Sequence, residues 1–244
     1  MALLSFDLAD PIALGATTIV AKPGLVYASP SAFFLGVDRS RYYGEPWYAE
    51  AAPSRAMELH GFALEADAVA TIYLGSGVVP GYVLNQFSLD EHDGDLRVAS
   101  TVYLGGAETR SLVTVLRPTA DGLETIGVVD GIAPREDIRS VRFDGDTGYV
   151  VTFEKTDPLF VVDLADPEAP TIRGELVIPG FSTYIHRLDD DHLLTIGRDI
   201  DPVTTQDYGM ALQIFDVSNP DAPVRTHVHT VPGAYSQAQY DHLA

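Results

Sequence analysis

The sequence predicts an all-β protein in which one short unit of antiparallel strands is repeated along the chain. Almost the same stretch occurs twice, as LFVVDLADPEAP at 159–170 and LQIFDVSNPDAP at 212–223. Short apolar runs rich in Val, Ile, Thr, Tyr and Phe are bounded by Gly, Pro, Asp and Asn, as strands usually are. No segment keeps a helical period of apolar residues over three turns, so a helical repeat is excluded.

The apolar run of the repeat recurs about every 50 residues. It is found as LLSFDL (3–8), MELHGFAL (57–64), SLVTVLR (111–117), LFVVDL (159–164) and LQIFDV (212–217). A polar turn and a second apolar run follow each time. Two more strand-like runs come before it, most clearly IRSVRFDG (138–145) and GYVVTFEK (148–155). Four short antiparallel strands in a repeat of this length are typical of a β-propeller blade.

The predicted organisation is a single β-propeller domain over residues 1–244, with about four full blades and a partial blade at each end. The blade units are expected at about 1–22, 23–75, 80–130, 137–179, 181–232 and 234–244. The chain then starts on a third strand and stops within a first strand. The last segment, AYSQAQYDHLA, could complete the first blade and close a five-bladed ring. We favour a fragment of a longer propeller, because this segment lacks a second strand.

The Asp-Pro and Asn-Pro steps of the repeat are expected to form turns. Asp166-Pro167 and Asn219-Pro220 have the residues that a type I turn prefers at its first two positions. Three consecutive carboxylates in RLDDDH (187–192) resemble a cation site, but a tight hairpin also favours Asp. The alternating acids and glycine of a calcium loop are absent. We therefore interpret these acidic residues as turn residues. The glycine-rich GSGVVPG (75–81) is expected to be a loop between blades.

Composition limits the possible partners. The chain has 244 residues, 46% of them hydrophobic, which is enough to bury a sizeable core. Its formal net charge is -20 and Lys22 and Lys155 are its only lysines, which argues against nucleic acid and anionic membranes. No stretch is long and apolar enough for a transmembrane segment. Without cysteine there is no disulfide, thiol nucleophile or Cys-ligated metal.

Several long stretches carry a resemblance to a known family. They are GSGVVPGYVLNQFSLDEHDGDLRVAST (75–101), IRSVRFDGDTGYVVTFEKTDPLFVVDLADPEAP (138–170), GELVIPGFSTYIHRLDDDHLLTIGRD (174–199), MALQIFDVSNPDAP (210–223) and AYSQAQYDHLA (234–244). They resemble the secreted β-propeller family of bacteria and archaea, a C-terminal propeller domain distantly related to WD-type repeats. Arg139 stands where this family is expected to have an aromatic residue, and Arg187 where it is expected to have proline.

The resemblance implies a secreted or cell-surface protein, although no signal peptide is visible in this chain. It also implies further blades upstream. It implies no particular reaction, because propellers include both enzymes and binding platforms.

If the repeats are blades, the first strand of each one lines the central channel, and polar residues there are candidate ligand contacts. The candidates are Tyr184, His186, Tyr240, His242, Arg139, Arg142, Asn85 and Gln86. The Tyr-x-His spacing occurs twice, and the period of a strand places both side chains of each pair on one face. The alternative interpretation is structural, since tyrosine and histidine on inner strands often hydrogen-bond between neighbouring blades.

Two histidines from neighbouring blades with one carboxylate would suit a divalent metal, so His186, His242 and Asp241 form a candidate metal site. No other cofactor is expected. The sequence contains no nucleophile elbow, phosphate-binding loop or HExxH motif. The predicted function is therefore a non-catalytic extracytoplasmic scaffold that binds a protein, peptide or carbohydrate. The alternative is a hydrolase or lyase with a metal or polar site at the channel mouth.

Overall fold

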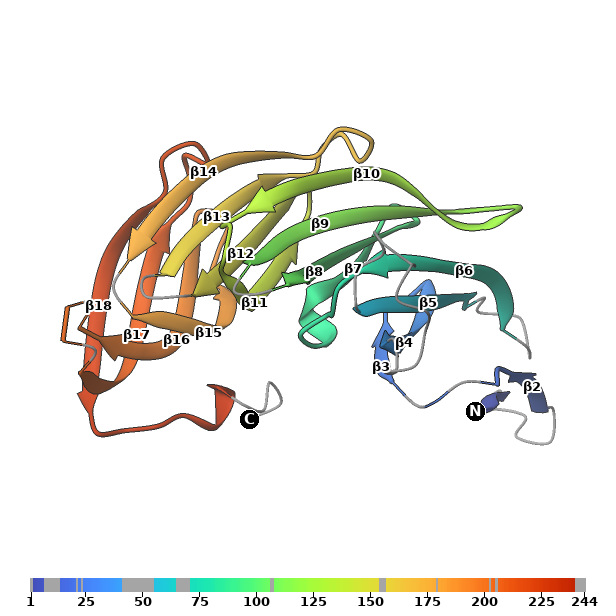
Figure 1. Ribbon diagram of the computed structural model, residues 1–244, viewed down its shortest axis with the longest axis horizontal. Coiled ribbons are helices and arrows are strands. Elements are labelled where there is room, and N and C mark those ends of the chain that lie inside the picture. The colour runs from blue at the N-terminus through green and yellow to red at the C-terminus, as the bar shows by residue number, and fades with distance from the viewer. Residues whose placement is uncertain are drawn as a thin grey trace. The chain divides into compact units, whose positions relative to one another are not determined.

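The computed structural model confirms an all-β fold of four-stranded antiparallel sheets (Figure 1). It describes residues 2–6, 14–20, 22, 24–40, 55–64, 71–105, 108–153, 157–178, 180–201, 203–204 and 206–239. Within these residues the strands form four four-stranded sheets and one two-stranded sheet. Each sheet follows the chain order, so consecutive strands are neighbours.

The strand bounds follow the predicted repeat closely. The two-stranded sheet pairs β1 (Ala2–Phe6) with β2 (Leu14–Thr18). The first four-stranded sheet contains β3 (Leu25–Ala28), β4 (Ala32–Ser40), β5 (Arg55–Ala63) and β6 (Ile72–Pro80). The second contains β7 (Leu89–His92), β8 (Asp95–Gly105), β9 (Glu108–Thr119) and β10 (Gly122–Ile132).

The two remaining sheets contain the near-identical stretches. One has β11 (Asp137–Asp144), β12 (Thr147–Phe153), β13 (Asp157–Asp163) and β14 (Thr171–Ile178). The other has β15 (Phe181–Arg187), β16 (His192–Ile200), β17 (Asp207–Asp216) and β18 (Val224–Pro232). In the four four-stranded sheets the repeated apolar run is the third strand, as β5, β9, β13 and β17 show.

The chain forms two compact units, each with its own hydrophobic core. One unit comprises Met1–Tyr103 with Thr114–Gly127, and the other Leu104–Val113 with Val128–Ala244. The first core contains Ala32, Phe34, Met57, Leu59, Val79, Val83, Leu89, Leu96, Val98, Leu116 and Leu123. The second contains Tyr149, Val151, Leu159, Val161, Ile178, Ile185, Leu193, Phe215 and Val217, so it joins the sheets β11–β14 and β15–β18. These cores form between sheets because alternate side chains of each strand point toward the neighbouring sheet.

The Asp-Pro and Asn-Pro steps form the expected turns. The Oδ1 atom of Asp166 accepts a hydrogen bond from the amide of Glu168, and its carbonyl accepts one from Ala169 at 3.1 Å. Asn219, at the equivalent position between β17 and β18, repeats both contacts and accepts from the amides of Asp221 and Ala222. These carboxylate and amide oxygens are therefore committed to turn geometry, as the turn interpretation predicted.

A Pro-Gly step ends the fourth strand in several repeats, and its glycine has a left-handed backbone. Gly81 has φ +84° and Gly180 has φ +90°. A Cβ at either position would lie 2.2 Å from the carbonyl oxygen of Thr101 or Arg198, respectively. Only glycine combines this backbone conformation with so close an approach.

Two local predictions differ from the structure. The stretch 75–81 was expected to be a loop, but nearly all of it belongs to β6. Its glycines serve close packing rather than a turn, because a Cβ on Gly75 would lie 2.6 Å from the Cα of Gly122. The segment 234–244 was expected to be a strand. Its described part contains the short 3₁₀ helix η2 (Gln237–Gln239). Among the described residues, no helix has the length and apolarity that crossing a membrane requires.

Candidate functional site

The first strands of the last two sheets, β11 and β15, lie side by side and carry four of the predicted site residues (Figure 1). We call them the inner-strand pair. The buried hydroxyl of Ser140 on β11 donates a 2.9 Å hydrogen bond to the carbonyl of Ser182 on β15. The ring of Phe153 on the neighbouring strand β12 lies 5.0 Å from that of Phe181 at the start of β15. A polar contact therefore joins the two inner strands, and an aromatic contact joins β15 to β12.

Tyr184 and His186 lie together on one face of β15, as the period of a strand requires. Their rings are nearly parallel, with centroids 6.3 Å apart, and the tyrosine hydroxyl is 3.4 Å from Nδ1 of His186. His186 is exposed and Tyr184 is half-buried. The pair thus presents a hydroxyl and an imidazole to solvent on a rigid strand.

Arg139 and Arg142 lie on β11 and do not meet the Tyr184–His186 pair in any described contact. The guanidinium of Arg139 lies 5.7 Å from the centre of the Phe153 ring, a cation–π geometry. The Nε atom of Arg142 is buried and has no hydrogen-bond partner in the described part of the chain. A buried donor without an acceptor is costly, so Arg142 is the least satisfied polar side chain of the inner-strand pair.

Arg187 has a structural role in place of the proline expected from the resemblance. Its guanidinium forms an ion pair with Asp144 of β11 and a second one with Asp190. Its Nε atom donates to the carbonyl of Asp189 at 2.9 Å. Arg187 therefore joins the ends of both inner strands and orders the acidic hairpin 188–191.

Asn85 and Gln86 are not on an inner strand, which corrects the sequence analysis. They lie at the 3₁₀ helix η1 (Gln86–Ser88), which precedes β7. The side chain of Asn85 accepts a hydrogen bond from the amide of Phe87 and caps this helix. The prediction failed because an Asn followed by a helical turn serves its own backbone, a local effect that the apolar pattern does not reveal.

The neighbouring carboxylates Asp90 and Glu91 are likewise used by the fold. Asp90 is paired with the buried Arg97 of β8. Burial raises the pKa of Glu91, but hydrogen bonds from Ser29, Ser31 and the amide of Gly94 outweigh it and leave this pKa lowered. Glu91 is therefore a charged link between the β3–β4 turn and β7 rather than a proton donor.

The remaining predicted residues, Tyr240, Asp241 and His242, lie outside the described part of the chain. The candidate metal set of His186, His242 and Asp241 therefore stays a prediction. In the residues that the structure does describe, no group of three or more His, Asp or Glu side chains is arranged to hold a metal ion.

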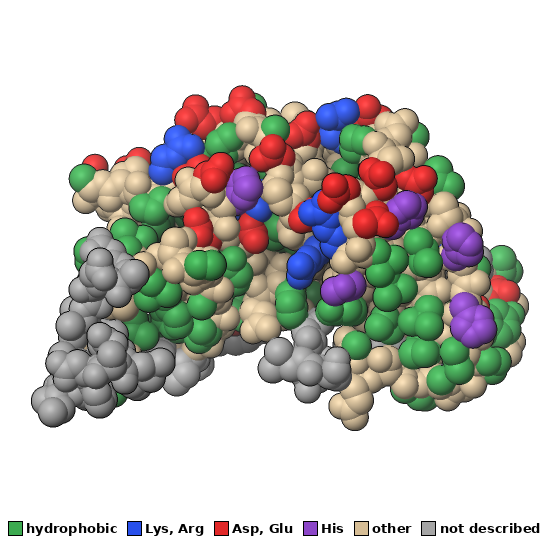
Figure 2. All heavy atoms as spheres, turned by 180° about the vertical axis from the view of Figure 1, so that it is seen from behind, with side chains coloured by type: hydrophobic (Ala, Val, Ile, Leu, Met, Phe, Trp, Pro, Cys, Tyr) green, Lys and Arg blue, Asp and Glu red, His purple; other side chains and the backbone are tan. Residues whose placement is uncertain are grey.

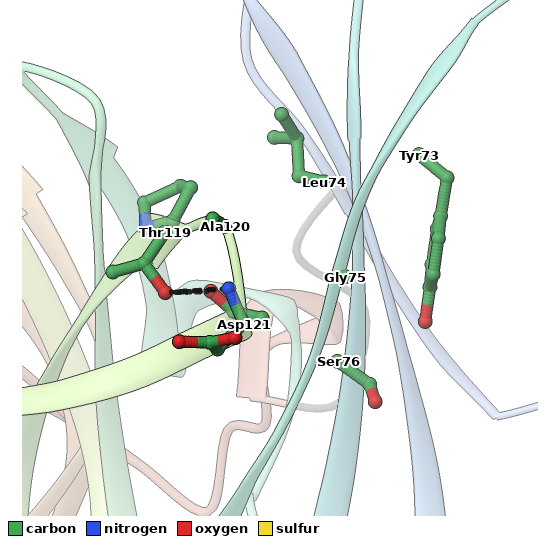
Figure 3. Close-up of a pocket in the computed structure, with 9 residues that line it drawn as sticks. Tyr73, Leu74, Gly75, Ser76, Thr119, Ala120 and Asp121 are labelled. Atoms are coloured by element: carbon green, nitrogen blue, oxygen red, sulfur yellow. Dashed lines mark hydrogen bonds between the residues drawn. The ribbon is translucent and has the colours of Figure 1, made fainter.

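A cavity of about 650 Å³ lies in the first unit, between β6 and the turn that joins β9 to β10 (Figure 3). Tyr73, Leu74, Gly75 and Ser76 line one side and residues 118–122 the other. Two of its polar side chains are already engaged. The hydroxyl of Thr119 accepts from the amide of Asp121, and the hydroxyl of Tyr73 lies 2.9 Å from Nδ1 of His60.

Sequence reasoning did not single out His227 and His229, which are both exposed on the edge strand β18. Together with His186 and His192 they place most of the histidines on the last sheet. On the right of Figure 2, histidine side chains gather beside apolar ones over this sheet. The signal that could have identified them is the spacing His-x-His within a predicted strand.

The chain matches one protein family and two curated archaeal proteins. The family model described as the beta propeller domain matches residues 1–244. An uncharacterized protein of Archaeoglobus fulgidus is 41% identical over 170 residues, which cover 70% of this chain and 25% of that protein. An uncharacterized protein of Methanocaldococcus jannaschii is 35% identical over 194 residues, 77% of this chain and 30% of that protein. The chain thus spans less than a third of the length of these curated relatives.

Proposed function

Because the chain belongs to the beta propeller domain family, we propose that it is a non-catalytic binding module whose ligand contacts the inner-strand pair. The observation that carries this proposal is the set of polar side chains on β11 and β15, above all Arg142. Tyr184 and His186 share one face, and His186 is exposed. The Nε atom of Arg142 is buried without an acceptor among the described residues. Elsewhere the polar side chains singled out from the sequence are used by turns and caps.

The arginines of this region favour an acidic ligand. Most described arginines pair with a carboxylate, such as Arg97 with Asp90 and Arg198 with Asp207. Arg135, Arg139 and Arg142 have no carboxylate within ion-pair distance among the described residues, although the chain carries a net charge of -20. A guanidinium binds a carboxylate through paired, charge-assisted hydrogen bonds. The proposed ligand is therefore a peptide, protein segment or carbohydrate that presents a carboxylate.

An extracytoplasmic location is part of the same proposal. It is supported by the resemblance of the chain to secreted β-propellers. A strongly acidic, cysteine-free surface is compatible with it, because large secreted domains can fold without disulfides.

The proposal is tested by titrating the protein with triglutamate and with trigalacturonate at physiological salt. These probes share the carboxylate and differ in their backbone. We expect saturable binding of at least one of them. Arg142→Gln should weaken it about tenfold or more, the effect of losing a charged hydrogen bond. His186→Ala should weaken it as well. Arg110→Gln is the matched control, because Arg110 lies in an exposed ion pair with Asp130.

Binding that survives Arg142→Gln unchanged would show that the inner-strand pair is not the ligand surface. Failure of both probes to bind would contradict the carboxylate assignment. Mass spectrometry of the recovered probes tests the alternative function, since cleavage of either one would favour the hydrolase or lyase over a non-catalytic module.

A further inference from the structure

The fourth strands of three sheets have equivalent positions that can be compared through their register. A β-bulge shifts the register between the third and fourth strands, after Gly61, Val161 and Ile214. The residues paired with these three are Gly75, Gly174 and His227. The next pairs, Leu59–Gly77, Leu159–Leu176 and Leu212–His229, are also equivalent, so one face of β18 carries His227 and His229 where β6 carries two glycines.

The two glycine positions are covered by the next sheet of their own unit. A Cβ on Gly75 would lie 2.6 Å from the Cα of Gly122, and one on Gly77 would lie 2.4 Å from the carbonyl oxygen of Leu123. In the other unit, a Cβ on Gly174 would lie 2.2 Å from the carbonyl oxygen of Pro220. A side chain the size of histidine could not occupy these covered positions.

His227 and His229 are both exposed, whereas Gly174, the equivalent of His227 on β14, is buried. The sheet β15–β18 packs over β14 so closely that Pro220 would collide with a Cβ at position 174. An element packed over β18 in the same way would collide with His227. Histidine at position 227 is therefore incompatible with the cover that Gly174 receives, whereas the position equivalent to His229 holds Leu176 in β14.

The two imidazoles are positioned to act together. Alternate residues of a strand lie on one face, about 6.5 Å apart along the chain. Nδ1 of His227 is 3.1 Å from the hydroxyl of Thr226, the bulge residue, which fixes the ring and leaves Nε2 directed elsewhere. No described contact engages the ring of His229. Two neighbouring imidazoles on a rigid strand are the donor set that Cu²⁺, Ni²⁺ and Zn²⁺ prefer among protein side chains.

We propose that His227 and His229 form a two-histidine chelate on β18 that binds a divalent first-row transition metal ion, with water completing its coordination. This site is separate from the inner-strand pair and from the candidate set of His186, His242 and Asp241. By the Irving–Williams order it binds Cu²⁺ most tightly.

The site is tested by isothermal titration of the full chain with CuCl₂ and, in parallel, with NiCl₂. Chelation makes binding of the second imidazole intramolecular, so either His227→Ala or His229→Ala alone should weaken the ion about 10²-fold. His192→Ala is the matched control, because His192 lies on the same sheet but is paired with Asp189. Substitution of the exposed His227 or His229 should leave the melting temperature unchanged.

A second measurement locates the ion directly. Substoichiometric Cu²⁺ should broaden the amide resonances of β18 more than those of β14 in the wild-type protein. Affinity that is unchanged in both single variants would overturn the proposal. So would a loss confined to the double variant, because it would mean two independent weak ligands instead of a chelate.

Discussion

The sheets β11–β14 and β15–β18 have nearly the same third strand, yet the same face of that strand has a different environment in each. Leu159 on β13 is completely buried, whereas its counterpart Leu212 on β17 is half-buried. The difference arises because Leu159 belongs to the core that joins the two sheets, and Leu212 lies on the face that points away from that core. The alternation of side chains in the sequence therefore specifies a strand and its two faces. Which face is buried in a core depends on where the neighbouring sheet packs.

The first sheet gives an independent example of a covered face. Leu59 on β5 is completely buried like Leu159, and it faces Gly77 across the ladder. Glycine occupies the position equivalent to His227 in both covered sheets, as Gly75 and Gly174. Residue size at this position of the fourth strand thus indicates whether another sheet can approach.

The comparison of the two third strands predicts the largest effect on stability at the buried Leu159. Leu159→Ala should lower the free energy of unfolding by about 2–5 kcal/mol, because it removes contacts and leaves a cavity in a core that joins two sheets. Leu212→Ala is the matched control and should cost clearly less, because much of this side chain is already in contact with water. Chemical denaturation of both variants measures the difference. Equal losses would mean that the two faces are equally covered in solution.

A smaller effect is expected from adding a side chain to the covered face. Gly174→Ala places a Cβ against the carbonyl of Pro220, and since a backbone atom cannot yield as a flexible side chain can, unfolding should become about 1–3 kcal/mol easier. The control is His227→Ala at the equivalent position of β18, which should be nearly neutral. Thermal melting of both variants provides the measurement. A neutral Gly174→Ala would contradict close packing of β14 against the β17–β18 turn.

Most of the fold could be predicted from the sequence, because strand and turn signals are local. The period of the repeat, the Asp-Pro turn at 166–167 and the strands around it all follow from residues close in the chain. The loop expected at 75–81 failed for a non-local reason. Its glycines and its place between two apolar runs suggested a loop. Their actual role is to let β10 approach β6, and that contact lies between segments far apart in sequence.

The candidate site was only partly predictable. The Tyr184–His186 pair follows from strand period alone, and the structure places the two rings together. The burial of the Arg142 Nε atom without an acceptor could not be foreseen. Whether a donor finds a hydrogen-bond acceptor depends on all the strands packed around it. His227 and His229 had a local signal, but its meaning required knowledge of which sheet face is covered.

The smallest predicted effect distinguishes the first hairpins of the same two sheets by their response to pH. In the β15–β16 hairpin, a hydrogen bond to Asp189 raises the pKa of His192 above 6.5, and the same contact lowers the pKa of Asp189 below 3.8. Stabilisation by this pair is therefore fullest between these two values. It is lost as pH rises through the raised histidine pKa or falls through the lowered aspartate pKa.

The β11–β12 hairpin turns through Gly145 and Asp146 and contains no histidine, so it serves as an internal control for that effect. Amide hydrogen exchange, corrected for the intrinsic rate, should show stronger protection of Leu188 at pH 5.5 than at pH 8.5, because its amide donates to the carbonyl of His192. Protection of the amides in the β11–β12 hairpin should be the same at both pH values. His192→Gln should abolish the difference at Leu188, since a neutral side chain at this position has no charge to gain. A pH response of equal size in both hairpins would assign the effect to the net charge of the chain rather than to the His192–Asp189 pair.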